Sequence, residues 1–409
     1  MDLSAPDSLE SSRPLAGFRI LDISSGIAGP YCTRLLASYG AEVLKVERPR
    51  LGDGSRRLGP FPGGVPDAEK SGLFAFLNRG KRGITLDVTR SDAQPLLDHL
   101  IAASDLVLTS LRPVTANDAG LTFDRVRGIS GKTALVAVTN FGQHGPYRDY
   151  HATDAILYGL GGPMHVTGHA GREPLRLGPR VVEFNGGMMA AYACSLALFQ
   201  LAMTGRGQFM DLSLLETQVA SHDRQASFVM AAQFTGETFL RMNPALVSER
   251  VWPCADGYID VGYNAVPFER VLAAIGRSDM KDDPRFTSVD ARQTPESQAE
   301  FIAMFLGWMV EHTMLEAWTI FQEHEIPSGP VYTSKEILAD PHFAERRIWD
   351  DLAIGEGTFR APRDMPWNGV PASPSLAAPR LGEHNRPVFL GQLGVSETDL
   401  DALIAGGVI

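Results

Sequence analysis

The sequence predicts an α/β protein whose first half holds a parallel β-sheet covered by helices. Strand-like runs alternate with helical runs from Phe18 to Phe141, and glycines mark several of the turns between them. Two parallel strands need a long crossover connection, usually a helix, so this alternation favours a parallel sheet. After Tyr147 the apolar pattern changes to longer helices, which indicates a second, smaller domain of another architecture.

The first strand, turn, helix and second strand form one βαβ unit. They are predicted at residues 18–23, 26–30, 31–39 and 41–47. The helix is expected to end at Gly40, because glycine readily adopts the left-handed backbone that terminates helices. The same alternation continues with a strand at 82–88, a helix at 92–103 and strands at 105–111 and 133–141.

The second half of the chain predicts longer helices and then a small α+β domain. Helical patterns lie at residues 154–161, 187–203, 216–234, 267–275, 296–310 and 314–324. A hairpin is predicted at residues 252–261, with its turn at Asp256-Gly257. Residues 326–331 are interpreted as the return crossing, and the proline-rich remainder is expected to be extended. The predicted division is a mobile tail at 1–14, a large domain at 15–224, a small domain at 225–330 and a returning segment at 331–409.

Composition and charge exclude several classes of protein. The 409 residues carry 37 lysines and arginines against 48 aspartates and glutamates, which gives a formal charge of -11. This sign disfavours nucleic acid and anionic membranes as partners, so an anionic ligand needs a local basic pocket. Three widely separated cysteines give neither a disulfide framework nor a paired metal site, which favours the reducing cytoplasm.

An uncharged run at residues 184–205 is long enough to be weighed as a membrane span. Its asparagine, glycines, serine and glutamine, and the lack of a second such run, favour a buried helix of an α/β enzyme. The first residues have no apolar segment typical of a signal peptide, so the protein is expected to be cytoplasmic with no membrane partner.

Most sequence signatures of catalysis are absent. No GxGxxG follows the first strand, no HExxH or Cys/His cluster offers metal ligands, and no GxSxG marks a hydrolase. Gly131-Lys132-Thr133 is similar to the end of a P-loop, but Val126 stands at the required upstream glycine. A basic run interleaved with glycine, from Lys45 to Arg82, has two interpretations. It either holds a phosphorylated ligand at the strand ends or forms a solvated basic face.

Several segments together resemble the class III CoA-transferases, the CaiB/BaiF or formyl-CoA-transferase-like family. The segments are Ala28-Gly29-Pro30-Tyr31-Cys32-Thr33-Arg34, Gly40-Ala41-Glu42-Val43-Leu44-Lys45-Val46-Glu47-Arg48-Pro49, Asn78-Arg79-Gly80-Lys81-Arg82, Phe141-Gly142-Gln143-His144-Gly145-Pro146-Tyr147, Asp211-Leu212-Ser213-Leu214-Leu215-Glu216 and Leu381-Gly382-Glu383-His384-Asn385. Each is weak alone, but their order and spacing cover nearly the whole chain.

This resemblance implies a Rossmann-like large domain built from both chain ends, a smaller α+β domain between them, and an interlocked dimer. It also implies an enzyme that exchanges CoA between an acyl-CoA and a carboxylic acid through a carboxylate of its own. That carboxylate forms a mixed anhydride and then a thioester with CoA. CoA is a substrate, and no metal or covalently bound cofactor is implied.

The family places its catalytic aspartate 29 positions after an acidic residue and before a Gly/Asn-rich segment. Asp154 matches the earlier acidic position, and Glu183 stands 29 positions later, so the resemblance assigns the nucleophile to Glu183. Glutamate in place of aspartate moves the carboxylate by roughly 1.5 Å, and a misplacement of about 1 Å can cost about a hundredfold in rate. Asp154 is interpreted as the N-cap of the helix that follows it.

The same resemblance assigns CoA contacts to Arg48, Leu86, Ser110 and Arg112. Two features depart from the family pattern, namely the sequence at residues 109–111 and Asp118, which would repel a CoA phosphate. The active site is therefore expected to be partly degenerate.

Three functions remain open. The first is an active transferase for a small or aromatic acid that uses Glu183. The second is a non-catalytic subunit that pairs with an active homologue, similar to succinyl-CoA:benzylsuccinate CoA-transferase. The third is an acyl-CoA racemase or epimerase, which is disfavoured because Thr153 stands where such enzymes place a histidine. The expected partner is accordingly a second copy in an interlocked homodimer or a homologous catalytic subunit.

Overall fold

The computed structural model describes most of the chain, namely residues 13–169, 171–220, 225–237, 250–262, 266–355, 357–363 and 377–409. The chain divides into two compact units. Unit 1 comprises residues 1–167, 174–239 and 348–409, and unit 2 comprises residues 168–173 and 240–347. Nearly all of the tail expected at residues 1–14 lies outside the described residues, so its mobility stays a prediction.

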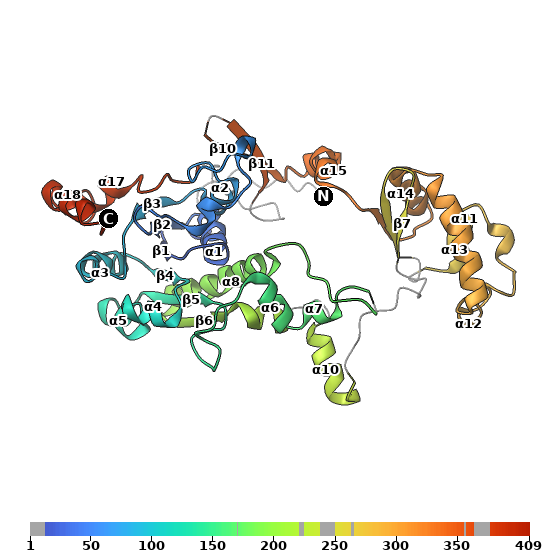
Figure 1. The fold of residues 1–409 in the computed structure, drawn as a ribbon, viewed down its shortest axis with the longest axis horizontal. Coiled ribbons are helices and arrows are strands. Elements are labelled where there is room, and N and C mark those ends of the chain that lie inside the picture. The colour runs from blue at the N-terminus through green and yellow to red at the C-terminus, as the bar shows by residue number, and fades with distance from the viewer. Residues whose placement is uncertain are drawn as a thin grey trace. The chain divides into compact units, whose positions relative to one another are not determined.

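Unit 1 holds a six-stranded sheet of order β3-β2-β1-β4-β5-β6, in which all neighbouring strands are parallel (Figure 1). The strands are β1 (Arg19–Ile23), β2 (Glu42–Glu47), β3 (Arg82–Thr85), β4 (Leu106–Thr109), β5 (Ala134–Thr139) and β6 (Phe209–Ser213). Strands β4 and β5 are buried along their whole length, because both faces of the sheet are covered. The predicted α/β class with a large parallel sheet is confirmed.

Helices cover both faces of this sheet. Leu106 and Leu108 point into one core and Val107 into the other, as alternate residues of a strand must. The first core is completed by α1 (Ala28–Ser38), α6 (Asp154–Leu160) and α8 (Val181–Thr204), and the second by α3 (Gln94–Ala102), α5 (Phe123–Ile129), α17 (Asn385–Phe389) and α18 (Glu397–Ala405). Helix α17 lies beside β3 (Figure 1), so both ends of the chain contribute to unit 1.

Three segments of unit 1 differ from the prediction. Residues 209–213 form the edge strand β6, and the helix expected at 216–234 is replaced by α9 (Leu214–Val219) and α10 (Gln225–Thr235). Helix α8 begins at Val181 and not at residue 187. Gly186 and Gly187 disfavour a helix by propensity, but tight packing against neighbouring elements overrides that preference. The other helices of the unit are α2 (Gly72–Asn78), α4 (Pro113–Asp118) and α7 (Pro163–Val166).

The expectation of an extended segment at residues 331–409 is wrong for much of its described length. It contains α15 (Ser334–Ala339), α16 (Pro341–Glu345), an antiparallel hairpin of β10 (Trp349–Ile354) and β11 (Gly357–Pro362), and the helices α17 and α18. Proline is compatible with the first helical turn, where Pro341 stands, so a high proline content does not exclude short helices. Residues 364–376, which hold three of the prolines, lie outside the described part.

Unit 2 is a small α+β unit with an antiparallel sheet. Its strands are β7 (Arg250–Pro253), β8 (Tyr258–Val261) and β9 (Ser328–Pro330), and its helices include α11 (Phe268–Ala274), α12 (Val289–Arg292), α13 (Pro295–Val310) and α14 (Met314–Glu323). The predicted hairpin is present, and Cys254 N–H donates to the Gly257 carbonyl at its turn. The bounds differ from the expected 225–330, because α10 packs against α9 in unit 1 and α15 and α16 belong to unit 2.

Helix α8 is the one helix in the described ranges that is long and apolar enough to cross a membrane. It packs against α1, β5, α6 and α9, and its residues Val182, Cys194 and Leu198 are buried in the core of unit 1. One face of α8 is thus part of the core, but its apolar stretch is only 39% buried, so the prediction of a buried helix holds for that face alone. The cytoplasmic location stays a prediction.

Candidate active site

Two cavities open at the carboxyl ends of the parallel strands, where open α/β sheets bind their ligands. The first, called the Arg48 cavity, has a volume of about 360 Å³ and lies between the ends of β1 and β2 and the segments after β3 and β4. The second, called the Glu183 cavity, has a volume of about 150 Å³ and lies between the ends of β1, β4 and β5 and the start of α8. Ser25 borders both cavities, so they adjoin.

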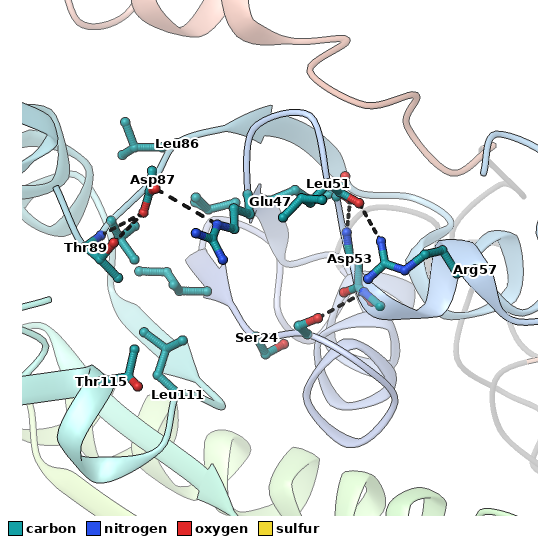
Figure 2. A pocket seen from close by; sticks show the side chains of 17 residues that line it. Ser24, Glu47, Leu51, Asp53, Arg57, Leu86, Asp87, Thr89, Leu111 and Thr115 are labelled. Atoms are coloured by element: carbon teal, nitrogen blue, oxygen red, sulfur yellow. Dashed lines mark hydrogen bonds and ion pairs between the residues drawn. The ribbon is translucent and has the colours of Figure 1, made fainter. Parts of the chain in front are cut away.

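The Arg48 cavity carries an exposed guanidinium and an apolar wall. Figure 2 shows Leu86 and Asp87 on one side of this cavity and Arg57 on the other. The side chain of Arg48 is 66% exposed, and its Nε lies 4.0 Å from a carboxylate oxygen of Asp87. Among the described residues this long ion pair is the one polar contact of the Arg48 side chain, so the guanidinium can turn toward a phosphate. Leu86 is buried and offers apolar surface to the same space.

The basic run from Lys45 to Arg82 does not form one phosphate-binding surface. Four of its cations are buried against carboxylates: Lys45 with Asp53 at 2.8 Å, Arg56 with Glu47 at 2.7 Å, Arg79 with Asp350 at 2.9 Å and Lys81 with Asp22 at 3.0 Å. Both sequence interpretations are therefore wrong for these four residues. Within this run Arg48 and Arg57 are the cations that border the Arg48 cavity.

The buried ion pairs organise the loop between β1 and α1, which separates the two cavities. Thr33 donates a hydrogen bond of 2.6 Å to Asp22, and Lys45 donates one of 2.8 Å to the Ser24 carbonyl. Burial alone would raise the pKa of Asp22, but Lys45, Lys81 and the Ser24 and Thr33 hydroxyls hold that pKa well below its ordinary value. Burial lowers the pKa of Lys81 to about 8, although Asp22 opposes this shift.

Glu183 lies in the first turn of α8 and borders the Glu183 cavity. The carboxylate of Asp154 accepts hydrogen bonds from the backbone N–H groups of Val182, at 2.9 Å, and Glu183, at 3.2 Å. The expectation that Asp154 caps its own helix is wrong, since Thr153 is the N-cap residue of α6. Asp154 instead caps the neighbouring helix, which fixes the first turn that carries Glu183.

The environment of Glu183 raises its proton affinity. Burial raises the pKa of Glu183, Arg180 opposes the shift from 3.6 Å, and Asp154 adds to it. A carboxylate whose pKa is raised is more basic and a stronger nucleophile once it has ionised. The N-terminal end of α8 favours the ionised form.

Ser110 and Arg112 border the Glu183 cavity, whereas Arg48 and Leu86 border the Arg48 cavity. The Ser110 hydroxyl accepts a hydrogen bond of 2.9 Å from the Ser25 backbone N–H, which joins the loops that follow β4 and β1. The four residues expected to contact CoA thus lie on two adjoining cavities. Asp118 ends α4 and lines neither of them.

The Gly/Asn-rich segment after Glu183 allows α8 to approach α1 closely. A Cβ atom on Gly187 would lie 2.7 Å from the Ala28 carbonyl oxygen and 3.0 Å from a ring carbon of Tyr31. The ring of Phe184 packs edge-on against Tyr31, with 5.0 Å between centroids. Any larger residue at Gly187 would push the first turn of α8, and with it Glu183, away from the strand ends.

Sequence reasoning missed four residues of the Glu183 cavity, namely Thr139, Asn140, Arg148 and Tyr150. Thr139 ends β5 and Asn140 follows it, so the rule that sites form at the carboxyl ends of strands could have found both. Arg148 and Tyr150 lie in the turn-rich segment before α6 and carry no spacing signal. In the part of the chain that the structure describes, no group of three His, Cys, Asp or Glu residues could hold a metal ion.

Fold and site define an α/β protein with two adjoining cavities at the carboxyl ends of a parallel sheet, one of them beside a helix-borne carboxylate. The chain belongs to CoA-transferase family III, whose family model matches residues 15–385. It is 33% identical to succinyl-CoA–D-citramalate CoA-transferase of Chloroflexus aurantiacus, over 97% of this chain and 98% of that protein. The predicted family is therefore confirmed.

Two further relatives extend the comparison. Subunit BbsE of succinyl-CoA:(R)-benzylsuccinate CoA-transferase from Thauera aromatica is 28% identical, over 96% of this chain and 97% of that protein. The crystal structure of a CAIB/BAIF family protein from Brucella suis superposes with a TM-score of 0.81 at 26% identity, over 93% of this chain and 99% of that one.

Proposed function

We propose that this chain transfers CoA between acyl-CoA and a carboxylic acid with Glu183 as its nucleophile. The Arg48 cavity then holds the nucleotide end of CoA, and the Glu183 cavity holds the acyl group. The observation that carries this proposal is that the two cavities meet at Ser25. A molecule with an anionic end and a reactive thioester end can thus present one end to Arg48 and the other to Glu183.

The reaction needs only one enzyme carboxylate. A carboxylate oxygen of Glu183 attacks the thioester carbonyl carbon, the carbon–sulfur bond breaks, and the CoA thiolate leaves a mixed anhydride behind. The thiolate then attacks the Glu183 carbonyl carbon of that anhydride, which releases the donor acid and forms a glutamyl-CoA thioester. The acceptor carboxylate repeats the two steps in reverse and leaves as acyl-CoA, so no proton or electron is consumed.

The charge of the site favours a small polar acid. Arg112 and Arg148 border the same cavity as Glu183, together with the polar side chains of Thr139 and Asn140. Two relatives that use succinyl-CoA, from Chloroflexus aurantiacus and Thauera aromatica, support succinyl-CoA as the first donor to test.

One exposed apolar face of α8 supports the proposal that the chain pairs with a second subunit. Five of its large apolar side chains are between 43% and 70% exposed and recur every three or four residues: Met188, Tyr192, Leu196, Phe199 and Met203. This spacing places them on one side of the helix, and exposed apolar faces of this kind mark protein interfaces. The occupant is a second copy in an interlocked homodimer or a homologous catalytic chain.

A non-catalytic role in a heteromer is the second candidate. Two observations favour it: Glu183 stands where the family pattern has aspartate, and one relative is itself named as a subunit. A racemase is disfavoured, because Thr153 stands where such enzymes place a histidine, and the nearby His151 contacts Arg112 at 3.0 Å.

The test is intact-mass spectrometry of the chain incubated with succinyl-CoA, followed by borohydride or hydroxylamine and peptide mapping. We expect a CoA adduct, or its reduced product, at Glu183. Glu183→Gln removes the nucleophilic carboxylate and should abolish the adduct. The control is Glu296→Gln, which changes the same residue type in the first turn of α13 in unit 2 and should react as the unsubstituted chain does.

Glu183→Asp separates the two candidate functions. An active glutamate enzyme should lose about a hundredfold in adduct rate, because the carboxylate retreats by one methylene. If the unsubstituted chain forms no adduct but Glu183→Asp does, the site is a degenerate aspartate site. Absence of any adduct, together with recovery of activity on co-expression with a homologous chain, would establish the non-catalytic subunit.

A further inference from the structure

The Glu183 cavity brings one carboxylate and two guanidinium groups together from three separate segments. Glu183 comes from the first turn of α8, Arg112 from the residue before α4, and Arg148 from the segment between β5 and α6. Such a set binds a carboxylate better than it binds an apolar group, since charged side chains around a small cavity favour an anion of matching geometry.

Each charged side chain that lines this cavity has a partner among the described residues. Glu183 is countered by Arg180 at 3.6 Å, and Nη1 of Arg112 contacts Nε2 of His151 at 3.0 Å. Arg148 pairs with the carboxylate of Asp149, and it differs from Arg112 in which of its nitrogens is engaged. Its Nε donates to Asp149 at 3.0 Å, but its two terminal nitrogens have no hydrogen-bond partner among the described residues.

The position of Arg148 suits the far end of a short substrate. Its side chain is 49% exposed, so it borders the cavity while remaining free to adjust, and it stands apart from Arg48 in the adjoining cavity. A guanidinium presents two parallel N–H groups to a carboxylate, which gives a directional, charge-assisted pair. The acyl carbonyl must face Glu183, so a guanidinium elsewhere on the cavity wall meets the remainder of the acyl chain.

We propose that Arg148 selects substrates with a second carboxylate, by pairing with the distal carboxylate of a short dicarboxylic acyl group while its thioester faces Glu183. The substrate class is then a dicarboxylic acid and its mono-CoA ester. This inference rests on the proposed function and adds to it the residue that decides specificity. Arg148 contacts the substrate without taking part in bond formation.

The experiment compares succinyl-CoA with butyryl-CoA, which has the same four-carbon chain without the distal carboxylate. The rate of adduct formation at Glu183 is followed by quenched mass spectrometry, so that a single half-reaction is measured with each donor. The unsubstituted chain should react with succinyl-CoA about 10- to 100-fold faster in kcat/KM, the range for a hydrogen-bonded charge pair.

Arg148→Met keeps the length of the side chain and removes the guanidinium. It should slow the reaction of succinyl-CoA by the same about 10- to 100-fold, mainly through KM, and leave butyryl-CoA within about twofold. Arg148→Lys should retain part of the preference, because an ammonium keeps the charge but loses the paired N–H geometry. The matched control is Arg127→Met, at an exposed arginine in the last turn of α5, which should leave both rates unchanged.

Two results overturn the role of Arg148 while leaving the transferase intact. One is equal reaction of the unsubstituted chain with the two donors, or a preference for butyryl-CoA. The other is an Arg148→Met variant that slows both donors alike, which would mean that Arg148 acts on CoA or on Glu183. If the unsubstituted chain forms no adduct with any donor, the proposed function fails first, and the assignment of Arg148 fails with it.

Discussion

The carboxylate of Asp154 lies 3.2 Å from the backbone nitrogen of Glu183 and accepts its hydrogen bond. The acidic pair that is spaced 29 positions apart is therefore joined through the backbone of α8 and not through its two carboxylates. Asp154 satisfies two N–H groups that the first turn of α8 would otherwise leave unpaired. The spacing thus reflects how the proposed nucleophile is positioned.

Replacing Asp154 should affect both stability and the reaction at Glu183. Asp154→Ala loses two hydrogen bonds at the start of α8 and should cost about 0.5 to 2 kcal/mol in the free energy of unfolding. It should also slow adduct formation, because the first turn of α8 is no longer fixed. Asp154→Asn keeps an acceptor oxygen and should cost less, as urea unfolding and adduct rates can measure. Equal effects of the two variants would contradict a capping role.

The raised pKa of Glu183 predicts a specific pH dependence. Attack requires the ionised carboxylate, so the rate of adduct formation should fall toward acid pH with a midpoint above the ordinary glutamate value of about 4.3. Asp154→Asn should move this midpoint to lower pH, since the charge of Asp154 raises the pKa of Glu183. A midpoint at or below the ordinary value would contradict the buried position of Glu183.

The raised pKa of Glu183 also makes the free energy of unfolding depend on pH. Because the folded chain holds the Glu183 proton more tightly than the unfolded chain, this group stabilises the fold below its unfolded pKa. That contribution is lost as pH rises through the folded pKa. Glu183→Gln should therefore increase the free energy of unfolding at neutral pH relative to the unsubstituted chain, and the gain should disappear in acid.

The parallel sheet could be predicted because its strands follow a local rule. Strands β1, β2, β4 and β5 are short apolar or alternating runs separated by turns and helices, and local pattern is sufficient to find them. Strand β6 was missed, because its residues Phe209 and Asp211 are exposed at the edge of the sheet and give no clear apolar run. The start of α8 was missed because Gly187 is explained only by its contact with α1.

Within the candidate site, the sequence predicts only those residues whose spacing along the chain points to them. Glu183 follows from its distance to Asp154 and from the family resemblance, whereas Arg148 reaches the same cavity through a turn-rich segment whose path depends on the tertiary fold. The buried cations illustrate the same limit. The sequence shows that Lys45 and Lys81 are charged, but only the fold shows that Asp22 lies between them.

The buried ion pair of Lys81 and Asp22 should contribute more to the free energy of unfolding than an exposed ion pair does. Lys81 Nζ also donates to the Pro30 carbonyl and to the Asn78 side chain, both at 2.8 Å. Lys81→Met leaves part of the negative charge of Asp22 uncompensated inside unit 1, which should cost about 3 to 5 kcal/mol in the free energy of unfolding.

The matched control for this ion pair is Lys70→Met. Lys70 forms a pair of 3.0 Å with Asp67, and both side chains are more than a third exposed, so its loss should cost about 0 to 1 kcal/mol. Urea unfolding of both variants measures the difference. Similar small losses would show that Lys45 alone is sufficient to balance Asp22.

The two threonines at the ends of β5 should respond differently to replacement by valine. Thr133 precedes the strand, and its buried hydroxyl donates to the Ser104 carbonyl at 2.8 Å, so Thr133→Val should cost about 1 to 3 kcal/mol. Thr139 ends the strand, and its buried hydroxyl has no hydrogen-bond partner among the described residues. Thr139→Val should therefore be neutral or stabilising, because it replaces an unsatisfied polar group with a methyl group of similar size.

Thermal unfolding of the two variants decides the comparison, with Thr133→Ser and Thr139→Ser as hydroxyl-retaining controls. A loss at Thr139 as large as that at Thr133 would mean that an ordered water satisfies this hydroxyl beside Glu183.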